Sequence, residues 1–494
     1  MIYTNFNVLA GANVAVSPFL QPPNGATILN GVNPSYKLGA LYKDVGYSRV
    51  STQTQDNKSI TGLFDFRQVP GTQRMMTTMN EATDANTQLF AKTPAGAWSE
   101  IGAAETAWTD FANINVEMES FIGYCFIVGQ GSVDGFLPVG SVTGVTFSTV
   151  TNVTNMAQGK YPKRYRDRMY VANCRSGGVN YPFRVYFSSV PAAGAITWTP
   201  ASDFFEVDYS EEITGIAENW DILVVFTENS AYKYDQSQRK KVWDLGCSNH
   251  RTIKTHKQSM FFCNRDGAWE SVGGGYPQNI SGEMIDFFRA GTPTSFFAEL
   301  IDEEYIVYVG NVTVDGFAYT NCELIFNIPT RLWRWRENTD QMTIFAKYLN
   351  GGVARRYMGD TDGNVWDKAK YTDTTLISAD TYVDVNSPGV SIPVNFELAP
   401  IILNPTKTQG IRELIAFADR AQGLKLKFRV LDRNARILTP YRDMGELTKY
   451  VNPFDVDIED GVLIQIAGSE NSSNPYFSFY GFCLDLTDQS VILK

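Results

Sequence analysis

Histidine is almost absent from this 494-residue sequence, and its cysteines do not cluster. The two histidines, His250 and His256, are six residues apart, which in a strand is about 20 Å at the usual rise per residue. They cannot share a metal ion without other ligands, so we expect two polar surface residues. The six cysteines occur singly, without a C-x-x-C pair, which indicates reduced, buried thiols and not a disulfide framework or a zinc site.

Long apolar runs and strong charge are also missing. No stretch of about 18 apolar residues predicts a membrane span, and the first residues lack the basic region and apolar core of a signal peptide. Charged residues make up 19% of the chain, and the formal net charge is −11. Because phosphate binding requires a basic face, we do not expect a dedicated nucleic-acid-binding protein. An acidic channel wall would instead repel DNA and let it slide.

Aromatic and β-branched residues are abundant. The chain has 25 Tyr, 31 Phe and 9 Trp, which favour pleated, half-buried strands. From Gly46 onward, short apolar or alternating runs are separated roughly every 8–12 residues by Gly, Asn, Asp and Pro, as in antiparallel β proteins. Helical periodicity is nearly absent, and we predict one short helix at residues 282–289. The sequence therefore predicts an all-β protein.

Three parts of the chain differ in pattern. Residues 1–45 are rich in Asn, Gly and Pro and are interpreted as an extended N-terminal arm that becomes ordered against something else. Residues 46–393 contain loose units of roughly 35–55 residues, which predicts a β-propeller of about six to eight blades, since radial stacking covers both faces of each sheet. Residues 394–494 contain a strand at 424–430 that alternates apolar and basic residues, which predicts a C-terminal β-sandwich-like domain.

Motifs that carry chemistry in other proteins are incomplete here. Residues 360–364, DTDGN, resemble a calcium loop but lack its Glu at the twelfth position, so a turn held by Asp and Asn side chains is favoured. Adjacent carboxylates such as Glu211 and Glu212 point to opposite faces of a strand and cannot form an acid/base pair. We therefore predict no enzyme, no catalytic or metal-binding residue and no cofactor. A glycosidase whose carboxylates are distant in sequence remains an alternative.

Two groups of basic residues are candidate contacts for DNA or for another subunit, and a solvated loop is the alternative. They are Lys160, Lys163, Arg164, Arg166 and Arg168, interleaved with tyrosines, and Arg239, Lys240 and Lys241. Trp333 and Trp335 alternate with arginines at 331, 334 and 336. They are a candidate aromatic contact that would either stack on a ligand or close a blade.

The order of these features resembles a known class of proteins. The phrases that carry the likeness are ITGLFDFRQVPGTQRM at 60–75, YPKRYRDRMYVAN at 161–173, ITGIAENWDILVVFTENSAYKY at 213–234, MFFCNRDGAWESVGG at 260–274 and YGFCLDL at 480–486. In style and order, most of residues 45–494 resembles the tail hub, nozzle or DNA-stabilisation proteins of short-tailed bacteriophages.

That resemblance implies a non-enzymatic virion protein that binds no cofactor. Such a protein forms a homo-oligomer, commonly a six-fold ring, attaches to the portal or tail adaptor and to other tail proteins, and encloses the channel through which double-stranded DNA leaves. It is assembled in the host cytoplasm and resides in the tail. The alternative function is a carbohydrate-binding or receptor-binding propeller of a tail, in which Trp333, Trp335 and Tyr357 would be exposed and stack on sugars.

Overall fold

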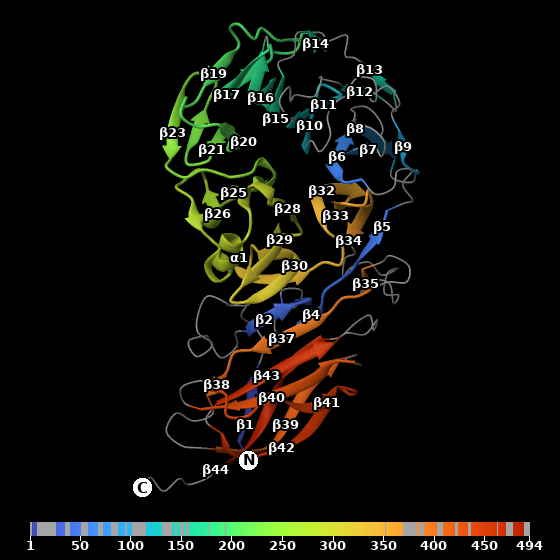
Figure 1. Cartoon of the computed structure of the whole chain (residues 1–494), viewed down its shortest axis with the longest axis vertical. Coiled ribbons are helices and arrows are strands. Elements are labelled where there is room, and N and C mark those ends of the chain that lie inside the picture. Colours follow the sequence, from blue (N-terminus) through green and yellow to red (C-terminus); the bar gives the residue numbers. More distant parts are fainter. Residues whose placement is uncertain are drawn as a thin grey trace.

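The computed structural model describes a large part of the chain in sheets and connecting turns. The described residues are 2–6, 26–34, 40–50, 58–67, 73–80, 87–93, 96–100, 115–130, 141–143, 146–148, 153–154, 158–176, 178–192, 194–350, 352–368, 383–384, 390–402, 409–419, 423–432, 436–461, 463–470 and 478–488. Within them the protein is all-β, as the sequence predicts (Figure 1). No helix in these ranges has the length and apolar character needed to cross a membrane.

Seven sheets, numbered in chain order, occupy the middle of the chain. Sheets 1 to 3 contain β6 (Ile60–Arg67), β7 (Gln73–Asn80), β8 (Thr87–Lys92) and β9 (Ser99–Glu100); β10 (Asn115–Phe121) and β11 (Tyr124–Gln130); and β15 (Gln158–Tyr165), β16 (Arg168–Ser176), β17 (Val179–Phe187) and β19 (Phe204–Glu206). Two short pairs lie beside them: β12 (Ser141–Thr143) with β13 (Thr146–Ser148), and β14 (Val153–Thr154) with β18 (Ile196–Thr197).

Sheets 4 to 7 follow the same order of antiparallel neighbours. They contain β20 (Ile213–Asn219), β21 (Ile222–Thr227), β22 (Ala231–Tyr234) and β23 (Arg239–Trp243); β24 (Lys254–His256), β25 (Ser259–Asn264), β26 (Gly267–Val272) and β27 (Gln278–Asn279); β28 (Phe297–Ile301), β29 (Glu304–Val314), β30 (Phe317–Asn327) and β31 (Leu332–Glu337); and β32 (Met342–Asn350), β33 (Val353–Asp360), β34 (Val365–Lys368) and β5 (Tyr47–Arg49). Sheet 7 also includes β35 (Val383–Asp384) and β36 (Val390–Ser391).

The first strands of consecutive sheets contact one another in a complete circuit. The contacts run from β6 to β10, β15, β20, β24, β28 and β32 in turn, and β32 returns to β6. Figure 1 shows this ring of sheets in its upper part, coloured from blue through green to orange. The ring is built from the region 46–393, for which the sequence predicts radially stacked sheets.

Strand β11 shows why the sheets stack. Its consecutive apolar residues are buried on both faces, as its sequence predicts. Cys125 and Ile127 share a hydrophobic cluster with Phe66 of sheet 1, whereas Phe126 shares another with Val171 of sheet 3. Burying one such large apolar side chain is worth about 1.5–3 kcal/mol. A sheet that is apolar on both faces therefore needs a neighbour on each side.

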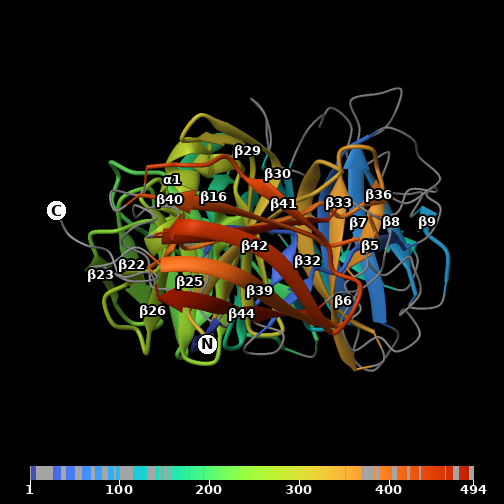
Figure 2. The ribbon, with the colours of Figure 1, turned by 90° about the horizontal axis from the view of Figure 1, so that it is seen from below.

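Two further sheets lie next to the ring, in the lower part of Figure 1 and in front in Figure 2. One is six-stranded and contains β1 (Ile2–Phe6), β3 (Val32–Asn33), β4 (Leu41–Lys43), β39 (Gln409–Asp419), β42 (Val451–Gly461) and β44 (Ser478–Asp488). The other continues sheet 6 through β2 (Ala26–Asn30), β37 (Val394–Leu398), β43 (Leu463–Glu470), β40 (Lys425–Leu431) and β41 (Arg442–Glu446), with β38 (Ile401–Ile402) beside β43.

The N-terminal segment is part of this architecture. Strand β1 pairs with β44 with Ile2 opposite Leu486, and β2 lies between β31 of the ring and β37. Strand β5 pairs with β34 and so completes sheet 7. The described residues of the segment 1–45, interpreted as an extended arm, thus become ordered against the C-terminal sheets and the ring.

Apolar and basic residues alternate along β40, and the apolar ones face a core between the two C-terminal sheets. Leu426 and Phe428 are buried while Lys425 is exposed, as the alternating pattern predicts. They share one hydrophobic cluster with Leu414 of the other sheet. The inward faces of both sheets therefore bury a common core.

The short helix predicted at 282–289 is confirmed as the 3-10 turn η3 (Gly282–Met284) followed by α1 (Ile285–Ala290). The other described 3-10 turns are η2 (His250–Thr252) and η4 (Pro293–Ser295).

The acidic turn at 360–364 has the hydrogen bonds of a side-chain-held turn. One carboxylate oxygen of Asp360 accepts from the backbone N–H of Asp362 and Asn364 at 2.9 and 2.7 Å. The other accepts from the indole of Trp366 at 2.7 Å and the amide of Asn364 at 2.9 Å. Four donors satisfy this carboxylate, so the turn needs no cation, and the predicted Asx turn is confirmed.

Candidate functional site

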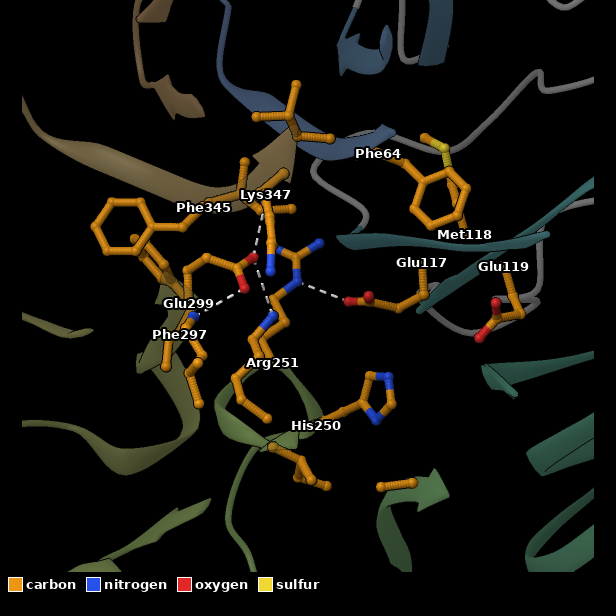
Figure 3. Close-up of a pocket in the computed structure, with 18 of the residues that line it drawn as sticks. Phe64, Glu117, Met118, Glu119, His250, Arg251, Phe297, Glu299, Phe345 and Lys347 are labelled. Carbon is orange, nitrogen blue, oxygen red and sulfur yellow. Dashed lines mark hydrogen bonds and ion pairs between the residues drawn. The ribbon is translucent and has the colours of Figure 1, made fainter. Parts of the chain in front are cut away.

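A cavity of about 470 Å³ lies where the first strands of the seven sheets converge (Figure 3). Its wall takes residues from β6, β10, β15, β20, β24, β28 and β32, and from η2. We call it the axial cavity. Each of these strands is the inner edge of its sheet, so its unpaired backbone groups face the centre. Polar side chains that reach across the centre can therefore bond to them.

Arg251 is the side chain that crosses the axial cavity. Its Nε donates to Glu117 Oε1 at 2.6 Å, and its Nη2 donates to the carbonyl oxygens of Thr61 and Val116 at 2.6 and 3.2 Å. The 3-10 turn η2 aims it, because Asn249 accepts from the N–H of Arg251 at 3.0 Å. This buried guanidinium therefore links η2, the turn that precedes the first strand of sheet 5, to sheets 1 and 2.

Other charges in the wall are also engaged. Glu299 accepts from the backbone N–H of Leu300 at 2.8 Å and of Lys347 at 3.0 Å, and from Lys254 Nζ at 3.5 Å. Lys163 donates to Glu119 at 2.9 Å. The carboxylate of Glu119 raises the pKa of Lys163 above its ordinary value, and this attraction outweighs the effect of burial. The cavity is thus largely neutralised by its own side chains.

His250 and His256 both line this cavity and neither is exposed, so the prediction of two polar surface residues is wrong. The ring of His250 is 5.0 Å from that of Tyr161, and its Nδ1 accepts from the backbone N–H of Ile216 at 3.3 Å. Burial lowers the pKa of His250 to about 4, since desolvation and the nearby cations outweigh the attraction of Glu117. His250 is therefore a neutral imidazole at pH 7.

The first basic group does not form one continuous face. Lys160 pairs with Glu212 at 2.6 Å, and Lys163 points into the axial cavity. Arg164 is exposed, Arg166 in the turn after β15 pairs with Asp221 at 2.8 Å, and Arg168 donates to the carbonyl oxygen of Ser188 at 2.8 Å. Most of these cations therefore serve contacts within the chain.

The second basic group lies elsewhere. Arg239, Lys240 and Lys241 are exposed on β23, the outermost strand of sheet 4, which Figure 1 shows at the rim of the ring. Lys241 pairs with Asp244 at 2.7 Å. The structure therefore separates this group at the rim from Lys160 and Lys163 near the centre.

The carbohydrate-binding alternative requires exposed aromatic side chains, and the structure contradicts this requirement. Trp333 and Trp335 are 2% and 1% exposed, and Tyr357 is 5% exposed. The indole of Trp333 donates to the carbonyl oxygen of Ile280 at 2.7 Å, and the ring of Trp335 lies 5.7 Å from that of Phe287 in α1. Large aromatic side chains gain most from burial, so this face of β31 packs into the core.

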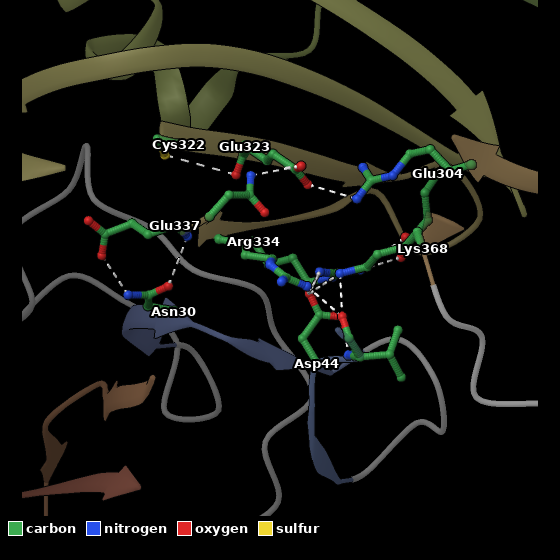
Figure 4. Close-up of polar contacts among 12 residues, drawn as sticks. Asn30, Asp44, Glu304, Cys322, Glu323, Arg334, Glu337 and Lys368 are labelled. Atoms are coloured by element: carbon green, nitrogen blue, oxygen red, sulfur yellow. Dashed lines mark hydrogen bonds and ion pairs between the residues drawn. The ribbon is translucent and has the colours of Figure 1, made fainter. Parts of the chain in front are cut away.

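The opposite face of β31 carries a buried ionic cluster (Figure 4). Because side chains alternate, Arg334 and Arg336 point away from the tryptophans. They lie 3.4 and 3.5 Å from the carboxylate of Asp44, and Lys368 lies 3.7 Å from it. Arg334 also forms two hydrogen bonds to Glu304 at 3.0 and 3.1 Å. Asp44 thus fixes the N-terminal segment to sheets 6 and 7.

The residues that sequence reasoning missed share one property. Arg251 and Glu117 are 134 positions apart, and Asp44 and Arg334 are 290 apart. No local spacing marks either pair. The alternating arginines at 334 and 336 were the available signal, since two buried cations on one strand face require an acidic partner.

Comparisons with known proteins give little further information. No protein-family model matches the chain, and no curated protein matches it. Among solved structures, the chain is similar to one titled "AfRom2 CNH domain", with a TM-score of 0.40 and 8% identity, over 66% of this chain and 100% of that one. A likeness with so low a TM-score carries no argument about function.

Proposed function

We propose that this chain is a non-enzymatic structural subunit of a bacteriophage tail, a hub or nozzle protein. The ring of seven sheets is a seven-bladed β-propeller, and the C-terminal sheets form a β-sandwich. Several copies, six in the resemblance stated above, surround the DNA exit channel and attach to the portal or adaptor and to other tail proteins.

The observation that carries this proposal is the continuous sheet. One ten-stranded sheet consists of the four strands of sheet 6 and six further strands, and β2 joins the two parts. Strand β1 pairs with β44, and β5 closes sheet 7 against β34. Tension between the ring and the C-terminal sheets is therefore borne by backbone hydrogen bonds and by the buried ionic cluster at Asp44. Such interlocking suits a protein under mechanical load.

DNA cannot pass through the axial cavity of one chain. Its volume of about 470 Å³ is that of a cube about 8 Å on a side, which is narrower than the ~12 Å major groove of B-DNA alone. Arg251 also spans it. A DNA channel would have to lie between subunits, and a net charge of −11 favours passage without adhesion.

An outward aromatic face supports contacts between copies. On β39, Leu414, Ala416 and Ala418 are buried, so Phe417 faces outward. Its ring is 6.5 Å from that of Tyr450, which is 61% exposed and lies 6.0 Å from Tyr480. Phe417 and Tyr480 are half-buried beside Tyr450, and aromatic residues are enriched at protein interfaces. We propose that this face meets a second copy, with Arg239, Lys240 and Lys241 as contacts to DNA or to a neighbouring subunit.

Negative-stain imaging of the chain, alone and mixed with portal or tail-adaptor proteins, tests the proposal. Rings with a central hole, on their own or docked to the portal complex, support it. A chain that stays as single particles and joins no virion protein contradicts it. The carbohydrate-binding alternative required exposed indoles at Trp333 and Trp335, and their burial removes its stacking platform.

A further inference from the structure

A second pocket, of about 520 Å³, lies where several inner strands begin. We call it the entrance pocket. Its lining residues are Lys160, Tyr161, Ser210, Glu211, Glu212, Thr214, Glu228, Asn229, Ser248, Asn249 and Thr294. Almost all of them are polar. Its size falls within the range of small-ligand sites, about 300–1,000 Å³.

The carboxylates of this pocket outnumber its cations. Lys160 pairs with Glu212 at 2.6 Å. Glu211 instead accepts from the hydroxyl of Thr227, and from the backbone and side-chain N–H groups of Asn229 at 3.4 and 3.2 Å. Glu228 accepts from the hydroxyl of Ser248 at 2.9 Å. Among the described residues, none forms an ion pair with Glu211 or Glu228. Glu228 belongs to the turn between β21 and β22, and Glu211 accepts from Asn229 of the same turn, so both carboxylates line the pocket without a cation of their own.

Lys241 is the other cation that acts on Glu211. Its ammonium, however, is bound to Asp244 at 2.7 Å, and its side chain is half exposed. The pocket therefore keeps about two uncompensated negative charges, which attract a cation.

Tyr161 is an independent observation that points to a ligand. Its side chain is 7% exposed and lines the pocket, yet within the described part of the chain its hydroxyl has no hydrogen bond. Burial and the carboxylates of Glu212 and Glu117 raise the pKa of this phenol, so the hydroxyl stays neutral. The ring is buried, but the hydroxyl lies at the pocket wall, so a ligand in the pocket can supply the hydrogen-bond partner that the described residues do not.

We propose that the entrance pocket binds a primary ammonium group. Its three N–H donors fit a site in which two carboxylates lack a cation and a phenol oxygen has lone pairs free. A free alkyl diamine and the lysine side chain of another protein supply the same chemistry. This proposal stands apart from the assembly proposed above, because a monomer would bind as well as a ring.

Isothermal titration calorimetry on the whole chain at about 0.15 M salt, where exposed charges are screened beyond about 8 Å, tests it. The probes are 1,4-diaminobutane, Nα-acetyl-lysine methylamide and tetramethylammonium. We expect saturable binding of a primary amine and none of tetramethylammonium, which has no N–H to donate. Binding of the diamine shows that a free amine suffices, whereas binding of the lysine derivative alone points to a protein side chain.

Three variants locate the site. Glu228→Gln and Glu211→Gln should each weaken binding about tenfold or more, and Tyr161→Phe about threefold to tenfold. Glu303→Gln is the matched control, because Glu303 is exposed, pairs with Lys257 and lies outside the pocket. Glu228 makes a single hydrogen bond from an exposed position, so its variant should fold normally, which thermal unfolding checks.

Three results would overturn the proposal. The first is no saturable binding of either amine up to about 10 mM, ten times a millimolar Kd. The second is equal binding of tetramethylammonium. The third is equal weakening by Glu303→Gln, which would mean that the amine only follows the negative charge of the whole chain.

Discussion

Replacing Arg251 with methionine removes the link that crosses the centre of the ring. The variant keeps an unbranched apolar side chain in place of the arginine stem but loses the ion pair to Glu117 and the hydrogen bonds to Asn115 and to the carbonyl oxygens of Thr61 and Val116. Arg251 and Glu117 have side chains only 7% and 14% exposed, so the carboxylate left behind is poorly solvated. Breaking a buried pair in this way costs about 3–5 kcal/mol.

Differential scanning calorimetry measures the effect. In large domains, each kcal/mol of lost unfolding free energy lowers Tm by about 2 °C, so Tm should fall by about 6–10 °C. The control is Arg166→Met, which removes an arginine paired with Asp221 at the surface and should leave Tm unchanged. In a double-mutant cycle, Glu117→Gln and Arg251→Met should couple by about 0.5–3 kcal/mol. Equal Tm values for the two arginine variants would refute the reasoning.

Three further predictions follow from buried groups. Lowering the pH from 6.5 to 4 should destabilise the wild type, because the unfolded state takes up a proton that His250, with its pKa lowered to about 4, does not. The loss is about 3 kcal/mol and levels off below pH 4, where the folded state takes up the proton as well. Tm should fall less over this range in His250→Asn than in the wild type or His256→Gln, and three parallel curves would contradict this. Asp44→Asn removes the charge shared by Arg334, Arg336 and Lys368, so the free energy of unfolding should fall by about 3–5 kcal/mol and limited proteolysis should cut the N-terminal segment faster. Asp244→Asn, at an exposed carboxylate, should change neither quantity. Equal cleavage of the two variants would count against the role of Asp44. Trp335→Ala should lower the free energy of unfolding by about 3–5 kcal/mol without altering the signal on a glycan array. Tyr276→Ala, at a 62% exposed ring, should leave Tm unchanged. A sugar signal that Trp335→Ala abolishes would restore the carbohydrate-binding alternative.

The sequence was most informative where the structure depends on neighbours in the chain. Alternation at 424–430, the short helix at 282–289 and the Asp360 turn rest on contacts within a few residues, and the structure confirms them. Alternation also separates Trp335 from Arg334 on opposite faces of β31. It does not say which face meets the core, and so the sequence left open whether the indoles stack on a ligand or close a blade; they are buried.

The contacts that define the ring and the axial cavity could not be predicted in this way. Arg251 bonds to the carbonyl oxygen of Thr61, 190 residues earlier, and β1 pairs with β44 at the other end of the described chain. Such pairings depend on which sheets become neighbours after folding, and a single sequence contains no spacing that records it. For the same reason the basic residues of β15 were grouped by position in the chain, although their side chains serve different contacts.

The mass of the purified chain in solution, by multi-angle light scattering, tests the central claim most directly. A structural ring subunit should have a mass that is an integral multiple of 55.1 kDa, six times for the predicted symmetry, and Phe417→Asp on the outward aromatic face should shift it towards the single chain. A wild-type mass of 55.1 kDa at all concentrations, alone and with portal or adaptor proteins, would contradict the account.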